Sequence, residues 1–406
     1  DGLTFFVGFC RIISVWIWFG QTVKSRLHIE LMMFKYLHFA FVSANIVIFI
    51  VQAAFSETRP MYHKPPIILA QLLQQYRYWR GKILRLLDIK GRTAWLYSPD
   101  CQTHFAGSLH PESPERTEAI EQALRRSGLW LLLQKIEAPD VTEVQLARVH
   151  TRRYLNDLES RLPAQGQVQI NDDTFLSRHT LQAARKAAGA AVKAVDMVMR
   201  KQAKNAFCAV RPPGHHAHAD KASGFCFINN VAVAAMHLIA EYRLERVAIL
   251  DFDVHHGDGT QDIFADDPRV MLLSSFEYPL YPFAEGELPA AAGRNPHIVN
   301  TPLKAGDGSQ AFRDAVRNRW LPALEAFRPQ FILLSAGFDA HKDDELAHLR
   351  LTEDDFEWLT KKIMLLANRH AKGRIVSVLE GGYHLPSLAA SAKAHIGCLV
   401  KASPFF

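Results

Sequence analysis

The chain has 406 residues, of which 49% are hydrophobic and 22% are charged. This composition supports one large domain with a full core, or two smaller ones, and excludes a disordered tail, a collagen and a disulfide-stapled miniprotein. The five cysteines are scattered without a Cys-x-x-Cys pair. They argue against a disulfide framework and against a thiolate zinc site, so we expect a protein of the reducing cytoplasm.

The net charge of +6 is concentrated at the start of the chain. Residues 1–90 contain 11 Lys and Arg against 4 Asp and Glu, while the remaining residues carry almost equal numbers of both signs. The main body therefore has no net positive field, and we do not expect it to bind nucleic acid.

Residues 1–90 differ from the rest in other ways. Residues 3–19 and 39–55 are apolar, and a basic, aromatic segment follows at 75–92. Three interpretations stay open: a membrane anchor with a basic juxtamembrane helix, a signal sequence starting at Met32 or Met33, or sequence that is not native coding, with Met61 as a later start. We expect a separate N-terminal extension over 1–90, the only part that could associate with a membrane, and a catalytic domain over 91–406.

After residue 92, short β-branched runs alternate with amphipathic helical patterns. The predicted strands are 93–98, 205–210, 246–252, 269–275, 330–336 and 374–380. The predicted helices are 114–127, 178–200, 228–242, 260–265 and 354–370. Buried Val, Ile and Leu runs separated by helices are typical of an α/β fold with a parallel sheet covered on both faces.

Polar residues follow five of these strands in succession, and ligands of such sheets bind at the carboxyl ends of the strands. The segments concerned are Arg211–His216, Asp251–Asp258, Ser274–Ser275, Asp339 and Glu380–Tyr383. Packing alone does not explain why five strand ends carry such residues to one edge, so we expect the active site there.

The alternation of Asp251, Asp253 and His255 directs their side chains to one side of an extended segment. With Asp339 from another strand, a carboxylate and an imidazole form a set of oxygen, oxygen and nitrogen ligands. Three protein ligands and one open position are typical of a catalytic zinc. The alternative is that these acids cap helices and pair with arginines.

Two adjacent histidines, His215 and His216, follow a rigid Pro-Pro-Gly turn. Asp251 and Asp258 are available to hold one ring each, which would fix the tautomer and raise the basicity. Such a histidine can remove a proton from water and later protonate a leaving amine. Tyr383 follows two glycines and could stabilise an oxyanion, although a tyrosine in that place could equally be a packing residue.

Several segments resemble the zinc-dependent histone deacetylase family: RPPGHHAHADKASGFCFINN, ILDFDVHHGDGTQDIF, SAGFDAH and LEGGYH, with HPESPERTEAI resembling its first helix region. The resemblance spans residues 93–400 and is greatest to the bacterial class II-like branch, which includes acetylpolyamine amidohydrolases and acetoin-utilisation proteins. It implies an arginase/deacetylase-like three-layer α/β sandwich around a central, mostly parallel eight-stranded sheet.

The resemblance also implies a role for each site residue. One catalytic ion, zinc or iron, would be bound by Asp253, His255 and Asp339. His216 would be the general base and acid, oriented by Asp258, while His215 would be held by Asp251 and Tyr383 would stabilise the transition state. Gly224 would accept the substrate amide N–H, and Phe225 would line the acyl channel. A structural potassium would take oxygens from Asp251, Asp253, His255, Ser274 and Ser275.

The sequence departs from the family at the opposite wall of this channel. Phe276 follows Ser274-Ser275 where the family usually has a histidine in a Ser-x-His pattern. The usual Tyr-Pro-Gly-Thr-Gly stretch is Tyr281-Pro-Phe-Ala-Glu285 here. The substrate contacts of this wall therefore stay open.

The function that we expect is hydrolysis of the acetamide of acetyl-lysine or of an acetylated amine by a zinc-dependent amidohydrolase. Acetylpolyamines and small acetamides are alternative substrates, and a non-catalytic metal-binding relative or a two-manganese ureohydrolase are alternative classes. A polyamine enzyme would need an acidic gatekeeper for its cationic substrate, and we expect Leu346 at the gate with Glu345 beside it.

Overall fold

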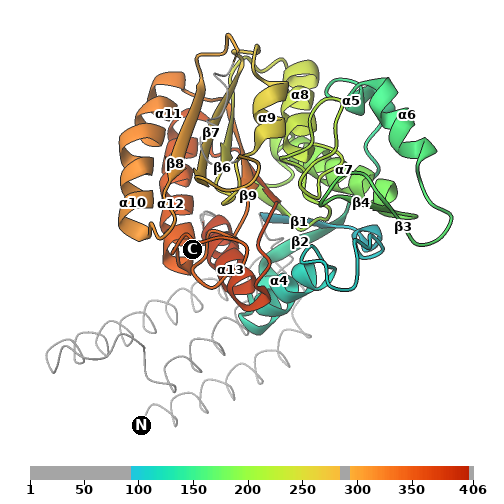
Figure 1. Ribbon diagram of the computed structural model, residues 1–406. Helices are drawn as coiled ribbons and strands as arrows, with labels where there is room; N and C mark the ends of the chain where they lie inside the picture. The colour runs from blue at the N-terminus through green and yellow to red at the C-terminus, as the bar shows by residue number, and fades with distance from the viewer. Residues whose placement is uncertain (1–92, 284–292, 402–406) are drawn as a thin grey trace, which may run out of the picture. The chain divides into compact units, whose positions relative to one another are not determined.

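The computed structural model describes residues 93–283 and 293–401 (Figure 1). The expected extension over 1–90, with its possible membrane anchor, lies outside this part of the chain. Within it, no helix combines the length and apolar character that crossing a membrane requires.

An eight-stranded sheet lies at the centre, in the order β2-β1-β5-β10-β9-β6-β7-β8, and every pairing in it is parallel. Its strands are β1 (Thr93–Tyr97), β2 (Leu133–Glu137), β5 (Asn205–Cys208), β6 (Val247–Asp251), β7 (Val270–Glu277), β8 (Ile298–Leu303), β9 (Phe331–Ala336) and β10 (Ile375–Leu379). A separate antiparallel pair is formed by β3 (Gln167–Gln169) and β4 (Phe175–Ser177). The α/β class and the parallel eight-stranded sheet predicted from the sequence are confirmed.

Helices cover both faces of this sheet (Figure 1). They are α4 (Glu115–Arg126), α5 (Glu143–Leu146), α6 (Arg152–Ser160), α7 (Thr180–Met199), α8 (Asn230–Tyr242), α9 (Asp258–Ile263), α10 (Ser309–Ala315), α11 (Leu321–Phe327), α12 (Glu353–His370) and α13 (Leu385–Lys401). Three short turns complete the elements of the described residues: the 3-10 helices Pro99–Gln102 and Leu129–Leu132, and a π-helical turn at Val316–Trp320 that joins α10 to α11.

The alternation of side chains along each buried strand divides the core into two layers. On β6, Val247 and Ile249 pack in the layer formed with α7 and α8, while Ala248 and Leu250 pack in the layer formed with α4, α12 and α13. Because both faces are covered, β6, β9 and β10 are buried along their whole length. This burial explains why their sequences are continuous apolar runs rather than alternating ones.

Gly189 lies in the middle of α7, where glycine is unfavourable for helix propensity. A Cβ atom at this position would lie 2.0 Å from the carbonyl oxygen of Pro139. The close approach of the preceding loop therefore accounts for a glycine within a helix that is otherwise rich in alanine.

The six strands and five helices predicted above all occur, with ends that shift by at most two residues; the helix predicted over 178–200, for example, is Thr180–Met199. The edge strands β2 and β8 escaped prediction because their sequences are mixed: β2 is LQKIE, and β8 carries a proline, Pro302. An edge strand has only one neighbour and tolerates polar residues and proline.

The five strands that carry polar residues lie side by side in the sheet, in the order β5-β10-β9-β6-β7. Because they are parallel, their carboxyl ends meet at one edge. Two details of the prediction were wrong. The strands are not consecutive in the chain, since β8 comes between β7 and β9, and Ser274 and Ser275 lie within β7, which continues to Glu277.

Candidate active site

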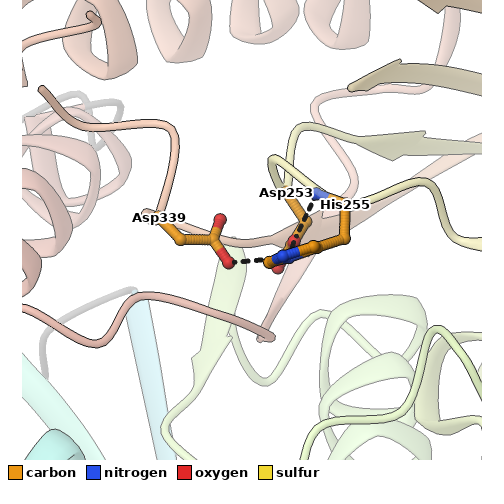
Figure 2. Close-up of side chains that lie close together, drawn as sticks. All are labelled: Asp253, His255 and Asp339. Carbon is orange, nitrogen blue, oxygen red and sulfur yellow. Dashed lines mark hydrogen bonds and ion pairs between the residues drawn. The ribbon is translucent and has the colours of Figure 1, made fainter. Parts of the chain in front are cut away.

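Asp253, His255 and Asp339 come together at the carboxyl edge of the sheet, and each offers one ligand atom within 4.8 Å of the others. Nδ1 of His255 is 3.1 Å from Oδ1 of Asp253 and 3.3 Å from Oδ2 of Asp339. Figure 2 shows the three side chains pointing toward one another. No second group of three ligand-type side chains meets this criterion in residues 93–283 and 293–401.

The environment of these side chains fits a divalent cation. Oδ2 of Asp339 is buried and accepts no hydrogen bond of good geometry from the described residues. Burial and the neighbouring carboxylate of Asp253 raise the pKa of Asp339 to about 7. Although burial favours a neutral ring, Asp253 and Asp339 raise the pKa of His255 to about 10. Two buried acids that face each other need a positive charge between them, and two carboxylates with one imidazole are a typical set for catalytic zinc.

Two glycines leave room for the carboxylates. A Cβ atom on Gly381 would lie 2.0 Å from Oδ2 of Asp339, and one on Gly337 would lie 2.1 Å from Oδ2 of Asp253. The backbone N–H of Gly381 also donates to Oδ2 of Asp253 over 2.7 Å. The first glycine of the Gly-Gly pair before Tyr383 is therefore required by close packing against the carboxylates of Asp253 and Asp339.

The two adjacent histidines each contact one aspartate. Nδ1 of His215 is 3.0 Å from Oδ2 of Asp251, and Nδ1 of His216 is 2.7 Å from Oδ1 of Asp258. Their rings lie with centroids 4.0 Å apart. Gly257 makes room for the first pair, because a Cβ atom there would lie 2.4 Å from Oδ2 of Asp251.

The two rings have opposite electrostatic environments. Burial opposes charge on His215, but Asp251 and Asp253 outweigh it and raise the pKa of this ring well above its usual value. Burial, reinforced by the neighbouring His215, lowers the pKa of His216 to about 4 despite the contact with Asp258. His215 is therefore a cation near neutral pH, whereas His216 is neutral and can accept a proton.

Tyr383 lies at the same edge, after the second glycine of the pair. Its ring is 5.9 Å from that of Phe225 at an interplanar angle of 89°, and the guanidinium of Arg116 lies 4.8 Å from its centroid. Burial raises the pKa of the phenol well above its usual value, against the opposing effect of Arg116. The hydroxyl group consequently keeps its proton and is available as a hydrogen-bond donor.

Sequence reasoning assigned no role to the buried groups that hold the Tyr383 turn. The side chain of Arg116 donates from Nε to the carbonyl oxygen of Gly382 over 2.7 Å and also bonds to the carbonyl oxygen of Glu380. Oδ2 of Asp344 accepts the backbone N–H groups of Tyr383 and His384 over 2.7 and 3.1 Å. A buried arginine in the first helix and an acid five residues after Asp339 were the only signals for these contacts.

Glu380 links the tyrosine turn to the paired histidines. Its carboxylate is fully buried and accepts the backbone N–H groups of Gly214 and His215 over 2.7 and 3.2 Å, and the hydroxyl of Ser335 over 3.2 Å. Burial raises the pKa of Glu380 to about 7. The residue fixes the turn before the catalytic pair without touching the metal group by a hydrogen bond.

Gly224 and Phe225 both adopt positive φ angles, +51° and +66°. A Cβ atom at Gly224 would lie 2.4 Å from Cδ2 of His216, so only glycine fits beside this ring. The ring of Phe225 stands between Tyr383 and His110, whose ring centroid is 4.5 Å away. Its backbone N–H is held by the hydroxyl of Thr174 over 3.1 Å.

Tyr281 lies beside His216, in the segment that departs from the family pattern. Its ring meets that of His216 edge-on with centroids 5.0 Å apart, and its hydroxyl is 2.7 Å from Oγ of Ser223. Phe276, which stands where the family has histidine, packs against the ring of His256 with centroids 4.5 Å apart. An aromatic contact therefore replaces a polar side chain at that position.

The residues expected at a potassium site lie on neighbouring strands. Asp251 on β6 is paired in register with Ser274 on β7, and Oγ of Ser274 is 3.1 Å from Nδ1 of His256. Ser275 is the next residue of the strand, so its side chain points to the opposite face of the sheet. It could contribute only its backbone carbonyl to an ion bound beside Asp251.

Comparison with known proteins agrees with the family resemblance seen in the sequence. Residues 110–399 match the model of the histone deacetylase domain. The histone deacetylase-like amidohydrolase of Pseudomonas aeruginosa is 38% identical over 72% of this chain and 82% of its own length. Human polyamine deacetylase HDAC10 is 36% identical over 69% of this chain, but the chain spans only 43% of that longer protein.

The solved structures agree with these relatives. The crystal structure of the HDA15 HD domain superimposes with a TM-score of 0.71 at 32% sequence identity, covering 78% of this chain and 91% of that one. Residues 110–399 contain seven of the eight strands of the sheet, all except β1, together with Asp253, His255, Asp339 and both histidine–aspartate pairs. The chain therefore belongs to the histone deacetylase family of deacetylases and amidohydrolases.

Proposed function

We propose that this protein is a zinc-dependent deacetylase that hydrolyses the acetamide of acetyl-lysine or of an acetylated amine. The observation that supports it best is the arrangement at one sheet edge: a neutral His216 held by Asp258, beside the metal group and Tyr383. A protein that only binds a metal would have no need for a general base and a phenol donor next to it. Zinc bound at this site would polarise the amide carbonyl and lower the pKa of a water molecule.

The residues of the chain would divide the remaining work. His216 accepts a proton from water on its free Nε2, because Asp258 faces Nδ1 and fixes that nitrogen as the donor. The same ring then gives this proton to the leaving amine nitrogen. His215, kept positively charged by Asp251, stabilises negative charge that develops nearby.

Tyr383 would donate its hydroxyl hydrogen to the carbonyl oxygen as that oxygen becomes negative. Its raised pKa keeps the donor protonated, and Arg116 and Asp344 hold its position. The carbonyl of Gly224, which also accepts from the thiol of Cys226 over 3.2 Å, would accept the substrate amide N–H. The rings of Phe225 and Tyr281 would line the narrow channel for the acyl-bearing chain.

A potassium ion beside Asp251, with oxygens from Asp253, His255 and Ser274 and the carbonyl of Ser275, is part of the same proposal. Its role would be structural, because it would lie beneath His215 rather than in the substrate channel. A hard monovalent cation prefers such an oxygen-rich site.

The substrate is tested by comparing acetyl-lysine peptides with acetylated polyamines and measuring released acetate. We favour the acetyl-lysine class because the expected gate residue, Leu346, is apolar and 37% exposed, whereas a cationic polyamine would be favoured by an acid there. The His216→Ala variant supplies the inactive reference and should lose about 10²–10⁴-fold in kcat. If wild type released acetate no faster than this variant, the proposed enzymatic activity would be refuted. The alternative of a non-catalytic metal-binding relative would then remain.

We also propose that residues 91–406 form the catalytic domain and that residues 1–90 are dispensable for chemistry. All the site residues named above lie after residue 92. A variant lacking residues 1–90 should keep the kcat and KM of the full chain on the same peptide. Loss of folded protein, judged by circular dichroism, would instead assign this segment to the domain.

A further inference from the structure

His218 lies two residues beyond the paired histidines and contacts the carboxylate that holds His216. Nε2 of His218 is 3.1 Å from Oδ2 of Asp258, while Nδ1 of His216 is 2.7 Å from Oδ1 of the same carboxylate. Each oxygen of Asp258 therefore has an imidazole of its own. None of the roles proposed above requires the second one.

The other nitrogen of His218 is also held. Its Nδ1 is 3.1 Å from Oδ2 of Asp262, which lies four residues after Asp258 on the same face of α9. Exposure rises outward along this row, from 4% for the side chain of His216 through 19% for His218 to 58% for Asp262. A continuous row of hydrogen-bonded groups thus connects the buried base to the surface.

The charges along this row alternate. The contact with Asp258 is the main cause that raises the pKa of His218; burial opposes it, and Asp262 adds to it. These two carboxylates are the charged groups that face the ring, and the neutral ring of His216 lies beyond Asp258. His150, packed from another segment, contacts only the backbone of His218. His218 therefore keeps its positive charge to higher pH than a free imidazole does, and it contacts the carboxylate that acts on His216.

The reaction does not require His218 to carry a proton to solvent. Hydrolysis consumes one amide and one water and yields a carboxylate and an amine, which together hold every atom of the reactants. The proton that His216 takes from water goes to the leaving nitrogen, and the carboxylic acid then protonates that amine. Since the site exchanges no net proton with solvent, the role of the second imidazole must be sought in its effect on Asp258.

We propose that His218 is a positioning residue, an inference that rests on the function proposed above. His218 binds Oδ2 of Asp258, so that Oδ1 stays in contact with Nδ1 of His216. It also weakens the attraction between that carboxylate and the proton on His216. Removal of the ring would free Asp258 to rotate. Removal of its charge alone would make His216 a stronger base.

The experiment compares His218→Ala, His218→Gln and Asp262→Asn with wild type. Glutamine can still donate to Oδ2 of Asp258 but carries no charge, and Asp262→Asn alters the ring from the exposed side. His370→Gln is the matched control, because His370 also contacts a carboxylate, that of Glu325, over 2.7 Å and is partly buried. For each variant we would measure kcat and KM against pH, the melting temperature and the metal content. The pKa of His216 would be measured by NMR titration of its ring.

His218→Ala should lower kcat by about 10-fold or more, the usual scale for losing a group that orients an active-site ligand or base, with a smaller change in KM. His218→Gln should retain most of kcat. In His218→Gln the pKa of His216, and with it the acidic limb of kcat/KM, should move to higher pH, because Asp258 stays in place and then acts without the opposing charge. Asp262→Asn leaves the contact between His218 and Asp258 intact and should move the limb little, and His370→Gln should not move it.

A wild-type pKa for His216 in His218→Gln would overturn the proposal, even if His218→Ala proved too unstable to study. A merely structural role for His218 predicts a lower melting temperature with an unmoved acidic limb. If wild type hydrolysed no acetamide, the proposed function would fail instead, and the NMR titration would still decide whether His218 acts on His216.

Discussion

The floor and the rim of this site are built by different means. The floor consists of Asp253, His255, Asp339 and the paired histidines, which directly follow buried parallel strands and are themselves buried or nearly so. The rim that we expect around it consists of loop residues with exposed side chains, such as Tyr281 and Leu346. The sheet therefore determines where the chemistry occurs, while the loops determine what reaches it.

The rim is attached to the floor by a few polar contacts. Asp344 accepts the N–H of Leu346 on Oδ1 and that of Tyr383 on Oδ2, so one buried carboxylate holds both the expected gate residue and the turn that carries the phenol. Glu277, at the end of β7, accepts the N–H groups of His348 and Leu349 in the same loop. Substitutions on the floor should consequently abolish chemistry, and those on the rim should shift selectivity.

The largest effect is expected from Asp253→Ala on the floor. Removing one of three ligands leaves an imidazole and one carboxylate, which hold a divalent ion poorly. We expect loss of bound zinc, measured by metal analysis, together with loss of acetate release. Asp314→Ala, which removes an exposed acid on α10, is the control and should retain both. Stoichiometric zinc with normal turnover in Asp253→Ala would show that the ligand set is wrong.

Tyr383→Phe lies at the junction of floor and rim and should have the second largest effect. The ring and its contact with Arg116 remain, but the donor to the developing oxyanion is lost. We expect kcat to fall by roughly 10²–10³-fold, the usual scale for one such donor, with much less change in KM. A tyrosine that served only to pack the rim would tolerate replacement by phenylalanine. A near-normal kcat would therefore show that Tyr383 is not the oxyanion donor.

Much of the floor could be predicted from the sequence because it depends on local signals. Apolar runs identify the central strands, and the polar residues after them identify the edge where ligands bind. The alternation in Asp251-Phe-Asp253-Val-His255 places its side chains without any long-range knowledge. The predicted residues therefore meet at one place once the strands are parallel and adjacent.

The rim, and the contacts that hold the Tyr383 turn, depend on residues far apart in the sequence, which no local pattern reveals. Arg116 is separated by 264 residues from Glu380, whose carbonyl it binds, and nothing near either residue in sequence indicates the pairing. The contact between Asp344 and the backbone N–H of Tyr383 could not be predicted for the same reason, because the two residues are 39 positions apart. Rim loops are held by such isolated contacts rather than by a repeated hydrogen-bond pattern, so the sequence places them least well.

The pH dependence should also separate floor from rim. His216 must be neutral to accept a proton, and burial lowers its pKa to about 4, so kcat/KM should be nearly flat between about pH 6 and pH 8 and fall at most about tenfold per unit below its pKa. The raised pKa of Tyr383 keeps the phenol protonated in the same pH range. Ionisation of Tyr383 should therefore not lower kcat/KM at any pH below the ordinary pKa of tyrosine. Metal content measured at the lowest pH distinguishes protonation of His216 from loss of the ion. An acidic limb centred near pH 7 would contradict the neutral, buried His216.

The smallest effect is expected on the rim, from Leu346→Glu. A carboxylate at this exposed position would pair with the free amines of an acetylated polyamine, and an exposed ion pair contributes about 0.2–1 kcal/mol. We therefore expect kcat/KM for acetylpolyamines to rise by at most about 5-fold and that for a neutral acetyl-lysine peptide to change little, with zinc content and the acidic limb as in wild type.

Leu365→Glu on α12 is the matched control, because Leu365 is also an exposed leucine, at 61%, in a part of the domain with no site residue. If Leu346→Glu reduced turnover of both substrates as severely as Tyr383→Phe, the gate would act on chemistry rather than on selection, and the division between floor and rim would be wrong. An increase of the same size in Leu365→Glu would show instead that overall charge, and not a gate at Leu346, attracts the amine.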